Sequence, residues 1–167
     1  MLRVRTPLGH LPWWAVAVGN AVYWPAWTFA CGYVVHRWSP EAFTQEGVVT
    51  RERSFEREGR FYEEQLHIRR WKDRMPEAGG LFAGGFAKRD VAGGDTDVMQ
   101  RFVAETRRAE LVHWAVTAGV AVPMLWNPWW AFPVHASVAA GSNLPCIAIQ
   151  RYNRARLQRV LRRRARR

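Results

Sequence analysis

The sequence predicts an all-α integral membrane protein with about three transmembrane helices, and three observations support this prediction. Leu111 to Gln150 contains no Asp, Glu, Lys or Arg, and neither does Leu11 to Val35. Because a helix rises about 1.5 Å per residue, roughly 20 apolar residues cross a bilayer core, so the longer run is sufficient to cross and return. Many of the ten tryptophans lie at the ends of these runs, as expected for membrane interfaces.

The first predicted span covers residues 12–35 and contains Pro25. A proline inside a helix kinks it, and in lipid the freed carbonyl group is satisfied locally. The run is too long for the apolar region of a cleaved signal peptide. We therefore expect one retained, kinked helix at the start of a single membrane domain that comprises residues 1–167.

The second and third predicted spans form a helical hairpin over residues 111–126 and 129–149. Asn127-Pro128 is the expected turn between them. Because the second span is short and both arms contain proline, a shallow re-entrant hairpin is the alternative to a full crossing. His135 lies within the third span, and we expect a neutral side chain that is hydrogen-bonded to another helix.

Residues 37–110 carry balanced charge and are predicted to form a cytoplasmic segment of helices and loops. Helix formers dominate from Arg51 to Trp71, but Gly59 interrupts the pattern, so we expect an interrupted helical segment that lies along the membrane surface. Residues 76–97 are rich in Gly and Pro and are predicted as a loop. Residues 98–113 are predicted as a helix that enters the bilayer.

The arginine-rich tail, residues 150–167, contains nine arginines and no acidic residue, and it supplies most of the net charge of +11. Lysine and arginine beside membrane spans favour the cytoplasmic side. We therefore predict a multi-pass protein of the cell membrane with a cytoplasmic C-terminus. Because the tail directly follows a span, its expected partner is anionic lipid, at about 1 kcal/mol per arginine, and nucleic acid is not expected.

The best candidates for catalysis lie in the string ETRRAELVHW, on the helix that enters the bilayer. Residues three or four apart share a helix face, so Glu105 neighbours Arg108, and Glu110 neighbours His113. A glutamate beside a histidine favours the imidazolium form or fixes one ring tautomer, and such a pair accepts a hydroxyl proton during acyl transfer. The alternative is a helix end whose charges only satisfy one another at the interface. The predicted catalytic residues are His113, Glu110 and Glu105.

Substrate-binding side chains are predicted on the same helix, around the end of the hairpin, and in the Gly-rich segment that begins at Trp71. Amide and cationic groups there suit a lipid headgroup, a phosphate or a sugar. The alternative for the segment after the hairpin is a cationic anchor that holds the helix in the membrane. Neither a metal ion nor a cofactor is expected, because the two cysteines lie in apolar runs without ligand spacing. The predicted substrate-binding residues are Arg108, Lys72, Asp73, Asn143, Gln150, Arg151, Asn153 and Arg154.

A di-metal site is a different interpretation of the same acidic residues and histidines. The sequence contains two Glu-x-x-His pairs, and two such pairs with two further glutamates form the carboxylate sites of di-iron helical bundles. Metal analysis of the purified protein distinguishes this hypothesis from acyl transfer. The residues concerned are Glu64 with His67, Glu110 with His113, and Glu63 and Glu105.

Three strings occur in order: WKDRMPEAG with a following GFAK (71–88), ETRRAELVHW (105–114) and NLPCIAIQRYNRARL (143–157). Their combination resembles the glycosyl-4,4'-diaponeurosporenoate acyltransferase family of bacterial membrane proteins. The resemblance covers about half of the chain and transfers no site residues. It implies an acyltransferase that esterifies the sugar of a glycosylated C30 carotenoid acid with a fatty acyl group.

The sequence-based hypothesis is a membrane acyltransferase that esterifies a sugar hydroxyl of a glycosylated carotenoid or a similar amphiphilic glycolipid. Its expected partners are membrane lipid, this acceptor and a fatty acyl donor. The competing hypotheses are a non-enzymatic membrane scaffold or anionic-lipid-binding protein, and the di-metal carboxylate enzyme. An alanine scan separates the first two classes, because an enzyme loses activity sharply at one or two positions.

Overall fold

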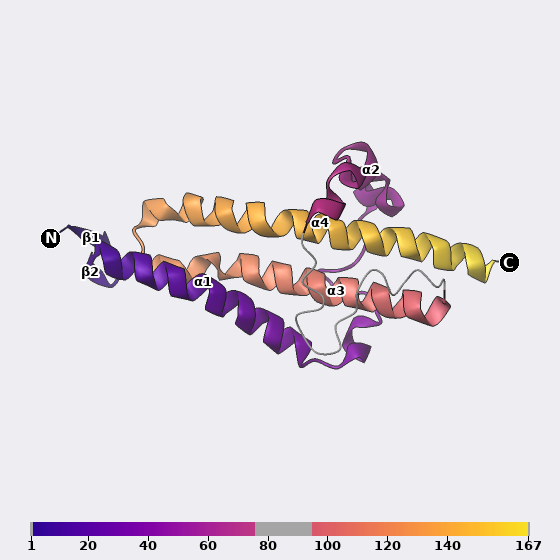
Figure 1. Ribbon diagram of the computed structural model, residues 1–167, viewed down its shortest axis with the longest axis horizontal. Helices are drawn as coiled ribbons and strands as arrows, with labels where there is room; N and C mark the ends of the chain where they lie inside the picture. The colour runs from indigo at the N-terminus through magenta and orange to yellow at the C-terminus, as the bar shows by residue number, and fades with distance from the viewer. Residues whose placement is uncertain (1, 76–94, 167) are drawn as a thin grey trace. The chain divides into compact units, whose positions relative to one another are not determined.

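The computed structural model describes residues 2–75 and 95–166, and these are mostly helical, which confirms the predicted helical class (Figure 1). The predicted loop at residues 76–97 lies almost wholly outside the described residues. Two short strands precede the first helix. The strands are β1 (Arg3–Thr6) and β2 (Gly9–Pro12), and the described α-helices are α1 (Trp13–His36), α2 (Arg60–Glu64), α3 (Thr96–Ala118) and α4 (Phe132–Ala165).

Helix α4 continues past residue 149, the predicted end of the third span, through the arginine-rich tail to Ala165. The reason is that Arg, Leu, Gln and Ala, which dominate the tail, all favour helix. The predicted helix at residues 98–113 is confirmed as part of α3. Short 3₁₀ helices join the other elements at Pro40–Phe43, Ser54–Gly59, Ile68–Arg70, Lys72–Arg74, Gly119–Leu125 and Trp129–Ala131.

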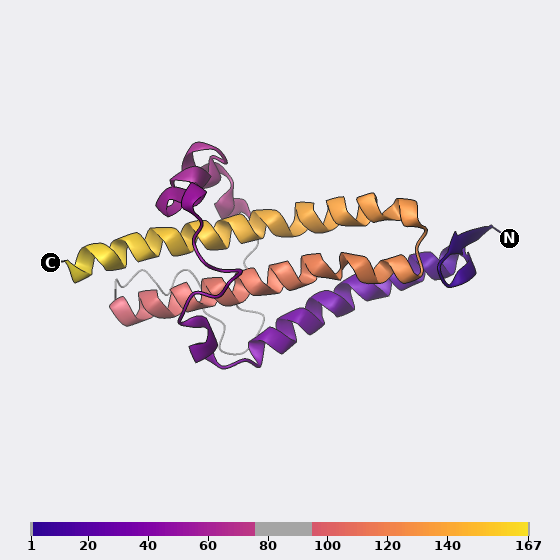
Figure 2. The same ribbon diagram turned by 180° about the vertical axis from the view of Figure 1, so that it is seen from behind.

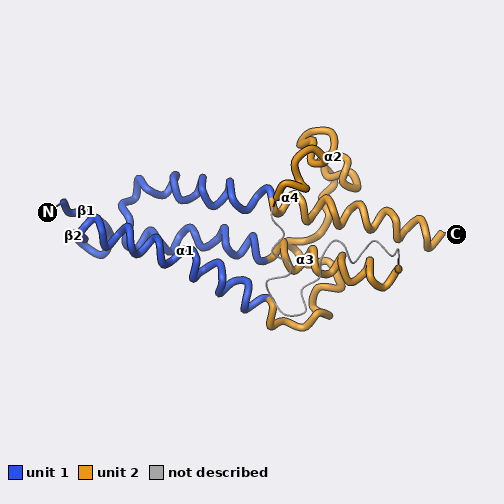
Figure 3. Tube along the Cα trace, in the orientation of Figure 1, with its two compact units in different colours: residues 1–35, 112–145 blue, residues 36–111, 146–167 orange. Residues whose placement is uncertain are grey.

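The chain divides into two compact units, each of which is described by itself (Figure 3). Unit 1 comprises Met1–Val35 and Val112–Pro145, and unit 2 comprises His36–Leu111 and Cys146–Arg167. Apart from Arg3 and Arg5, unit 1 contains no Lys, Arg, Asp or Glu. The charge-free runs and the charged segments of the sequence therefore fall into separate units.

Unit 1 begins with an antiparallel hairpin that sequence analysis did not predict (Figure 2). Thr6 of β1 pairs with Gly9 of β2, so only two residues form the turn between the strands. Gly9 has a φ of 104°, which glycine adopts without the steric cost that a Cβ atom brings. The Thr6 hydroxyl donates a hydrogen bond to the Gly9 carbonyl oxygen at 3.0 Å. The four-residue strands are too short to show an alternating apolar pattern.

The turn of the helical hairpin lies at Asn127-Pro128, as predicted, and α1 is bonded to it. The side-chain amides of Asn20 and Asn127 donate to each other's oxygen atoms, at 3.0 and 2.8 Å. The Trp126 indole N–H also donates to the Asn20 side-chain oxygen, at 2.9 Å. Asn127 is 3% exposed, so these bonds satisfy polar groups that would otherwise be costly to bury.

The predicted helix at residues 111–126 changes character at its middle. Helix α3 ends at Ala118, and a 3₁₀ helix continues from Gly119 to Leu125. Pro123 has no N–H to donate to the Gly119 carbonyl group, and its ring would clash with that carbonyl in an α-helix. The freed carbonyl oxygen instead accepts a hydrogen bond from the Tyr23 hydroxyl at 2.7 Å. The predicted second span is therefore helical, but it changes from α-helix to 3₁₀ helix after Ala118.

Replacing Gly119 with alanine is expected to destabilise the protein by about 1–3 kcal/mol, because overpacking forces neighbouring groups to move. A Cβ atom at this position would clash with the Trp27 indole nitrogen, which donates to the Ala115 carbonyl oxygen. Thermal unfolding in neutral detergent measures the change. Gly141→Ala is the matched control, because a Cβ atom there meets nothing within 4 Å. Equal unfolding temperatures for the two variants would contradict the close packing at Gly119.

The core of unit 2 forms where its short helices pack against α4. Tyr62, Ile68 and Tyr152 are its buried residues, at 4%, 0% and 0% exposure. The Tyr152 hydroxyl donates to Glu63, and it accepts from the Arg69 guanidinium. These contacts therefore hold the segment that contains Tyr62, Ile68 and Arg69 in place against α4.

The predicted helical segment from Arg51 to Trp71 is broken, as expected, at Gly59. Gly59 has a φ of 91° and precedes the five-residue helix α2. Arg57 and Glu58 also adopt left-handed conformations, at φ of 46° and 56°, which non-glycine residues rarely do. The Glu52 carboxylate accepts a hydrogen bond from the Glu58 backbone N–H at 2.8 Å and supports this bend.

One helical segment in the described part of the chain, Trp129–Ala165, is long and apolar enough to cross a membrane. Only 22% of its most apolar window is buried within the structure. The core helix of a soluble protein would bury most of that surface. Helix α1 runs without a break through Pro25 but does not reach the same hydropathy, because tryptophan, tyrosine, proline and asparagine lower it.

Candidate active site

The most enclosed charged group of unit 2 is the Glu110 carboxylate on α3, which is 0% exposed. Its Oε1 atom accepts a hydrogen bond from Arg151 Nε at 2.6 Å, and its Oε2 atom accepts from Arg154 Nη2 at 2.6 Å. Both arginines lie on α4, three residues apart, so they share one helix face. Two charge-assisted bonds to one carboxylate therefore join α3 to α4 within unit 2.

Glu56 completes this buried cluster. It is 1% exposed, and its carboxylate pairs with Arg151 Nη1. The same arginine donates from Nη2 to the Val49 carbonyl oxygen at 2.6 Å, and Arg154 donates to the Thr50 carbonyl oxygen at 2.9 Å. The cluster therefore ties the segment before α2 to both long helices. We call Glu56, Glu110, Arg151 and Arg154 the glutamate–arginine cluster.

Electrostatics keeps Arg151 charged in this buried position. Burial by itself disfavours the guanidinium cation, but the negative charges of Glu110 and Glu56 outweigh it and raise the pKa of Arg151. Tyr62 lies beside them, and burial, reinforced by the charge of Glu56, raises the pKa of its hydroxyl. Both groups therefore keep their usual protonation states at neutral pH.

In unit 1, the His113 ring is held by a single amide side chain. The distance from His113 Nδ1 to Asn143 Oδ1 is 2.9 Å. Asn143 Nδ2 donates to the Ala139 carbonyl oxygen, so its Oδ1 atom is the acceptor for the ring. A neutral His113 therefore carries its proton on Nδ1 and has a lone pair on Nε2. This tautomer can accept a proton at Nε2.

His135 shows the opposite arrangement. The Trp24 indole N–H donates to His135 Nδ1 at 3.3 Å, so a neutral ring carries its proton on Nε2. The two rings also stack, with centroids 6.0 Å apart. The prediction that His135 is hydrogen-bonded to another helix is confirmed, and its Nδ1 lone pair is occupied by Trp24.

A family model for glycosyl-4,4'-diaponeurosporenoate acyltransferase matches residues 44–163, which include His113, Asn143 and the whole glutamate–arginine cluster. The chain belongs to this acyltransferase family. Its relatives include glycosyl-4,4'-diaponeurosporenoate acyltransferases of Staphylococcus aureus strains USA300, N315 and bovine RF122 / ET3-1. Each is 30% identical over 122 residues, which is 72% of this chain and 72% of the relative. No solved structure matches the chain.

Membership of the acyltransferase family rests on more of the chain than the three strings found in the sequence. Those strings cover residues 71–157, whereas the family match begins at residue 44. The added part contains Glu56 and the carbonyl groups of Val49 and Thr50, which bind the cluster arginines. The segment that closes the cluster therefore belongs to the shared part of the family.

The other predicted site residues of this acyltransferase lie in separate pairs or alone. Glu105 accepts two bonds from Arg108 Nη1, at 2.9 and 3.1 Å, and the Arg108 guanidinium lies 5.0 Å from the centre of the Phe43 ring. Lys72 donates to Asp73 at 2.6 Å. Both pairs lie in unit 2, where Gln150 and Asn153 are half-buried residues of α4.

Two predicted roles look different in the structure. Asn143, predicted to bind substrate, orients the His113 ring. Both carboxylate oxygens of Glu110, predicted to act with that histidine, accept bonds from cluster arginines. A helix-face argument does not show which partner each side chain has.

Glu56 was not predicted as a site residue, whereas Arg107 was considered, with Arg108, as a side chain that holds a phosphate or carboxylate. Glu56 lies in a charged string that forms a 3₁₀ helix and then turns left-handed at Arg57. No periodic pattern therefore marks Glu56 as buried. Arg107 is 5% exposed and donates from Nη1 to the carbonyl oxygens of Phe43 and Thr44. A charge-rich string gives no signal for burial, because exposed glutamate and arginine are the usual case.

The geometry does not favour the di-metal interpretation. His67 has a φ of 46° and lies beyond the end of α2, so Glu64 and His67 are not presented on one helix face. The Glu110 carboxylate is occupied by two guanidinium groups. Within residues 2–75 and 95–166, no three His, Cys, Asp or Glu side chains are grouped as metal ligands.

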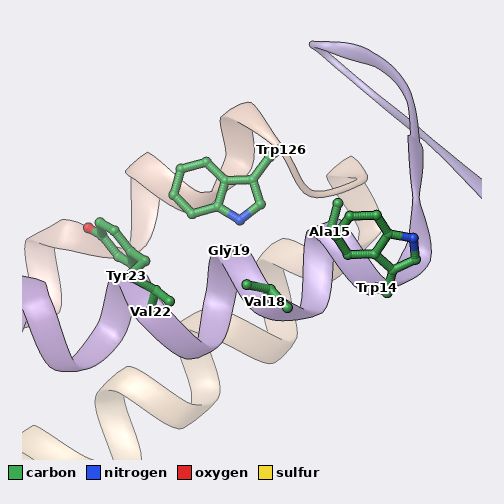
Figure 4. A pocket seen from close by; sticks show the side chains of 7 residues that line it. All are labelled: Trp14, Ala15, Val18, Gly19, Val22, Tyr23 and Trp126. Carbon is green, nitrogen blue, oxygen red and sulfur yellow. The ribbon is translucent and has the colours of Figure 1, made fainter.

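Unit 1 of this acyltransferase also carries an apolar groove of about 500 Å³ (Figure 4). The Trp126 ring lies beside Gly19, and Trp14 and Tyr23 lie toward its two ends. A Cβ atom at Gly19 would approach the Trp126 indole nitrogen to 3.0 Å, so the glycine keeps this contact close. The lining residues, none of them charged, are Trp14, Ala15, Val18, Gly19, Val22, Tyr23 and Trp126.

Proposed function

We propose that this acyltransferase esterifies a sugar hydroxyl of a glycosylated carotenoid acid, or of a similar amphiphilic glycolipid, with a fatty acyl group. The single observation that carries the proposal is the contact between His113 and Asn143. This contact leaves the Nε2 lone pair of His113 able to accept a proton, and the chain belongs to a family of acyltransferases. The acceptor is inferred from the names of the relatives, and the reaction step is inferred from the chemistry of the histidine.

In the proposed reaction, His113 Nε2 accepts the proton of the sugar hydroxyl as its oxygen atom bonds to the acyl carbonyl carbon. The bond from that carbon to the leaving group of the acyl donor then breaks. The imidazolium returns its proton to the departing group, so the histidine ends in its starting form. Asn143 keeps the Nδ1 proton in place throughout, because its oxygen atom only accepts.

We further propose that the protein acts in the cell membrane, with about three spans and a cytoplasmic C-terminus. The helical segment Trp129–Ala165 supports this, and unit 1 exposes large apolar side chains that water would solvate poorly. The apolar groove would offer hydrocarbon surface to an acyl chain. The arginines at the end of α4 favour the cytoplasmic side. Examples of the exposed apolar residues are Val18, Val22, Phe29, Trp129, Val134 and Val138.

Membership of the family favours an enzyme over a non-enzymatic scaffold, and one experiment tests the choice. The gene is expressed in a host that makes the glycosylated carotenoid acid but has no acyltransferase for it, and extracted pigments are analysed by mass spectrometry. We expect new species that are heavier than the glycoside by one fatty acyl group. The Staphylococcus aureus USA300 relative, expressed in the same host, is the positive control. Unchanged glycoside beside an active control would contradict the proposed acceptor.

A further inference from the structure

The described residues of unit 2 contain more buried positive than buried negative charge. Arg107, Arg151 and Arg154 are at most 8% exposed, whereas Glu56 and Glu110 are the buried carboxylates among the described residues. Three buried guanidinium groups thus face two buried carboxylates. An uncompensated charge in a poorly hydrated interior is costly unless an anion pairs with it.

Two of the three arginines also carry buried N–H groups without an acceptor in the described structure. Arg154 Nη1 and Arg107 Nε are both shielded from solvent and make no hydrogen bond. Arg151, by contrast, uses all three of its nitrogens, on Glu110, Glu56 and Val49. Among the three buried arginines, the donors without an acceptor therefore fall on Arg107 and Arg154, and a further one, Arg108 Nε, belongs to the arginine that pairs with Glu105.

Arg107 lies three residues before Glu110 on the same face of α3, and Arg154 donates to Glu110, so the two arginines lie near one carboxylate. Burial lowers the pKa of Arg107, and the positive charge of Arg154 lowers it further. A water molecule between them would accept hydrogen bonds but would leave the repulsion in place. An oxyanion would satisfy the free N–H groups and remove the repulsion at the same time, which is the usual role of arginine forks.

Of the two described carboxylates that act on Arg107, Glu110 is bound by Arg151 and Arg154, and Glu46 is weakly held. Glu46 approaches Arg107 Nη2 only to 3.9 Å, and its side chain is 44% exposed. An exposed pair at that distance contributes little to stability. Glu46 is therefore a counter-ion that an entering anion can replace, and its own charge opposes that entry.

We propose that Arg107 and Arg154 bind a phosphate group, in competition with Glu46. The inference deepens the proposed function, because activated acyl donors such as coenzyme A thioesters and phospholipids carry phosphate. The bound phosphate belongs either to a soluble ester of this kind or to a lipid headgroup. The site lies within unit 2 and its assignment uses no residue of the His113–Asn143 pair.

The test measures binding without turnover on the purified full-length protein in neutral detergent. Inorganic phosphate, coenzyme A and micelles containing phosphatidylglycerol are titrated by calorimetry, and thermal unfolding is followed at constant ionic strength. We expect saturable phosphate binding that raises the unfolding temperature, because a ligand of the folded state stabilises it. Tighter binding of coenzyme A than of phosphatidylglycerol indicates a soluble ester, and the reverse indicates a headgroup.

Three variants make the assignment specific. Glu46→Gln removes the competing charge, and we expect phosphate to bind about two- to five-fold more tightly, the factor that an exposed ion pair supplies. Arg107→Gln removes one charged donor, and we expect binding about ten- to 100-fold weaker. Arg162→Gln removes an exposed arginine that pairs with Glu58, and it should bind like the unmodified protein.

Several outcomes would overturn the inference. They are the absence of saturable binding of any phosphate probe, binding that Glu46→Gln fails to tighten, and binding that Arg162→Gln weakens as much as Arg107→Gln. Binding of a fatty acid carboxylate without phosphate binding would overturn it as well. If Arg107→Gln does not fold, phosphate binding by Glu46→Gln and by the unmodified protein still tests the inference. Because no step requires acyl transfer, loss of the proposed enzymatic activity would leave this result interpretable.

Discussion

Replacing Glu110 with alanine is expected to lower the free energy of unfolding by about 3–5 kcal/mol, the usual result of removing one partner of a buried ion pair. Its carboxylate accepts bonds of 2.6 Å from both Arg151 and Arg154, and it is 0% exposed. Without it, the buried positive charge of the cluster is opposed by Glu56 alone. Chemical unfolding in neutral detergent, followed by tryptophan fluorescence, measures the loss.

Glu105→Ala is the matched control for Glu110→Ala. It removes the same side chain from the same helix, but Glu105 is 19% exposed and pairs with Arg108 three residues along. A pair of this kind contributes about 0–1 kcal/mol. Glu110→Gln should fall between the two alanine variants, because it keeps an acceptor oxygen and loses the charge. Similar losses for Glu105→Ala and Glu110→Ala would show that the cluster does not hold α3 to α4.

Replacing His113 with glutamine is expected to lower the rate of acyl transfer by about 10²–10⁴-fold, the contribution of a general base. Glutamine can still bond to Asn143, so we expect the helices and the amount of folded protein to be unchanged. The measurement is the initial rate of ester formation with membranes that contain equal amounts of each protein. A rate near that of the unmodified protein would exclude His113 as the base.

Two further variants separate proton transfer from a general disturbance of unit 1. His135→Gln removes another histidine of this unit, which bonds to Trp24, and it should leave the rate nearly unchanged. Asn143→Leu removes the acceptor that fixes the Nδ1 proton. We expect a smaller loss of rate than for His113→Gln, together with a displaced pH–rate profile, because the ring is still present but its tautomer is no longer fixed. A purely structural role for Asn143 would lower the rate without moving the profile.

The helices were predictable because their signals are local. The charge-free runs predicted α1 and the hairpin, Asn127-Pro128 predicted its turn, and Gly59 predicted the break before α2. Local signals also explain the errors. Pro123 was visible in the sequence, but the donor that satisfies the carbonyl group it frees is Tyr23, 96 residues away along the chain.

The candidate site was predictable in its residue types and not in its pairings. His113, Asn143, Glu110, Arg151 and Arg154 were all selected, because polar groups at the ends of an apolar hairpin are unusual. Their partners were not, because each bond spans 30 residues or more of sequence. Glu56 gave no signal at all, and nothing in the sequence showed that Arg107 is buried, since burial of a charged residue is decided by what packs over it.

The sequence by itself determined the helical class, the apolar hairpin and, through its three strings, the resemblance to an acyltransferase family that the family match then confirmed. The tertiary structure alone decided which atoms meet. It gave His113 an amide partner and so one tautomer, and it placed two glutamates among three buried arginines. The physical reason is that hydropathy and helix propensity act over neighbouring residues, whereas hydrogen bonds and ion pairs depend on distances that only the folded chain sets.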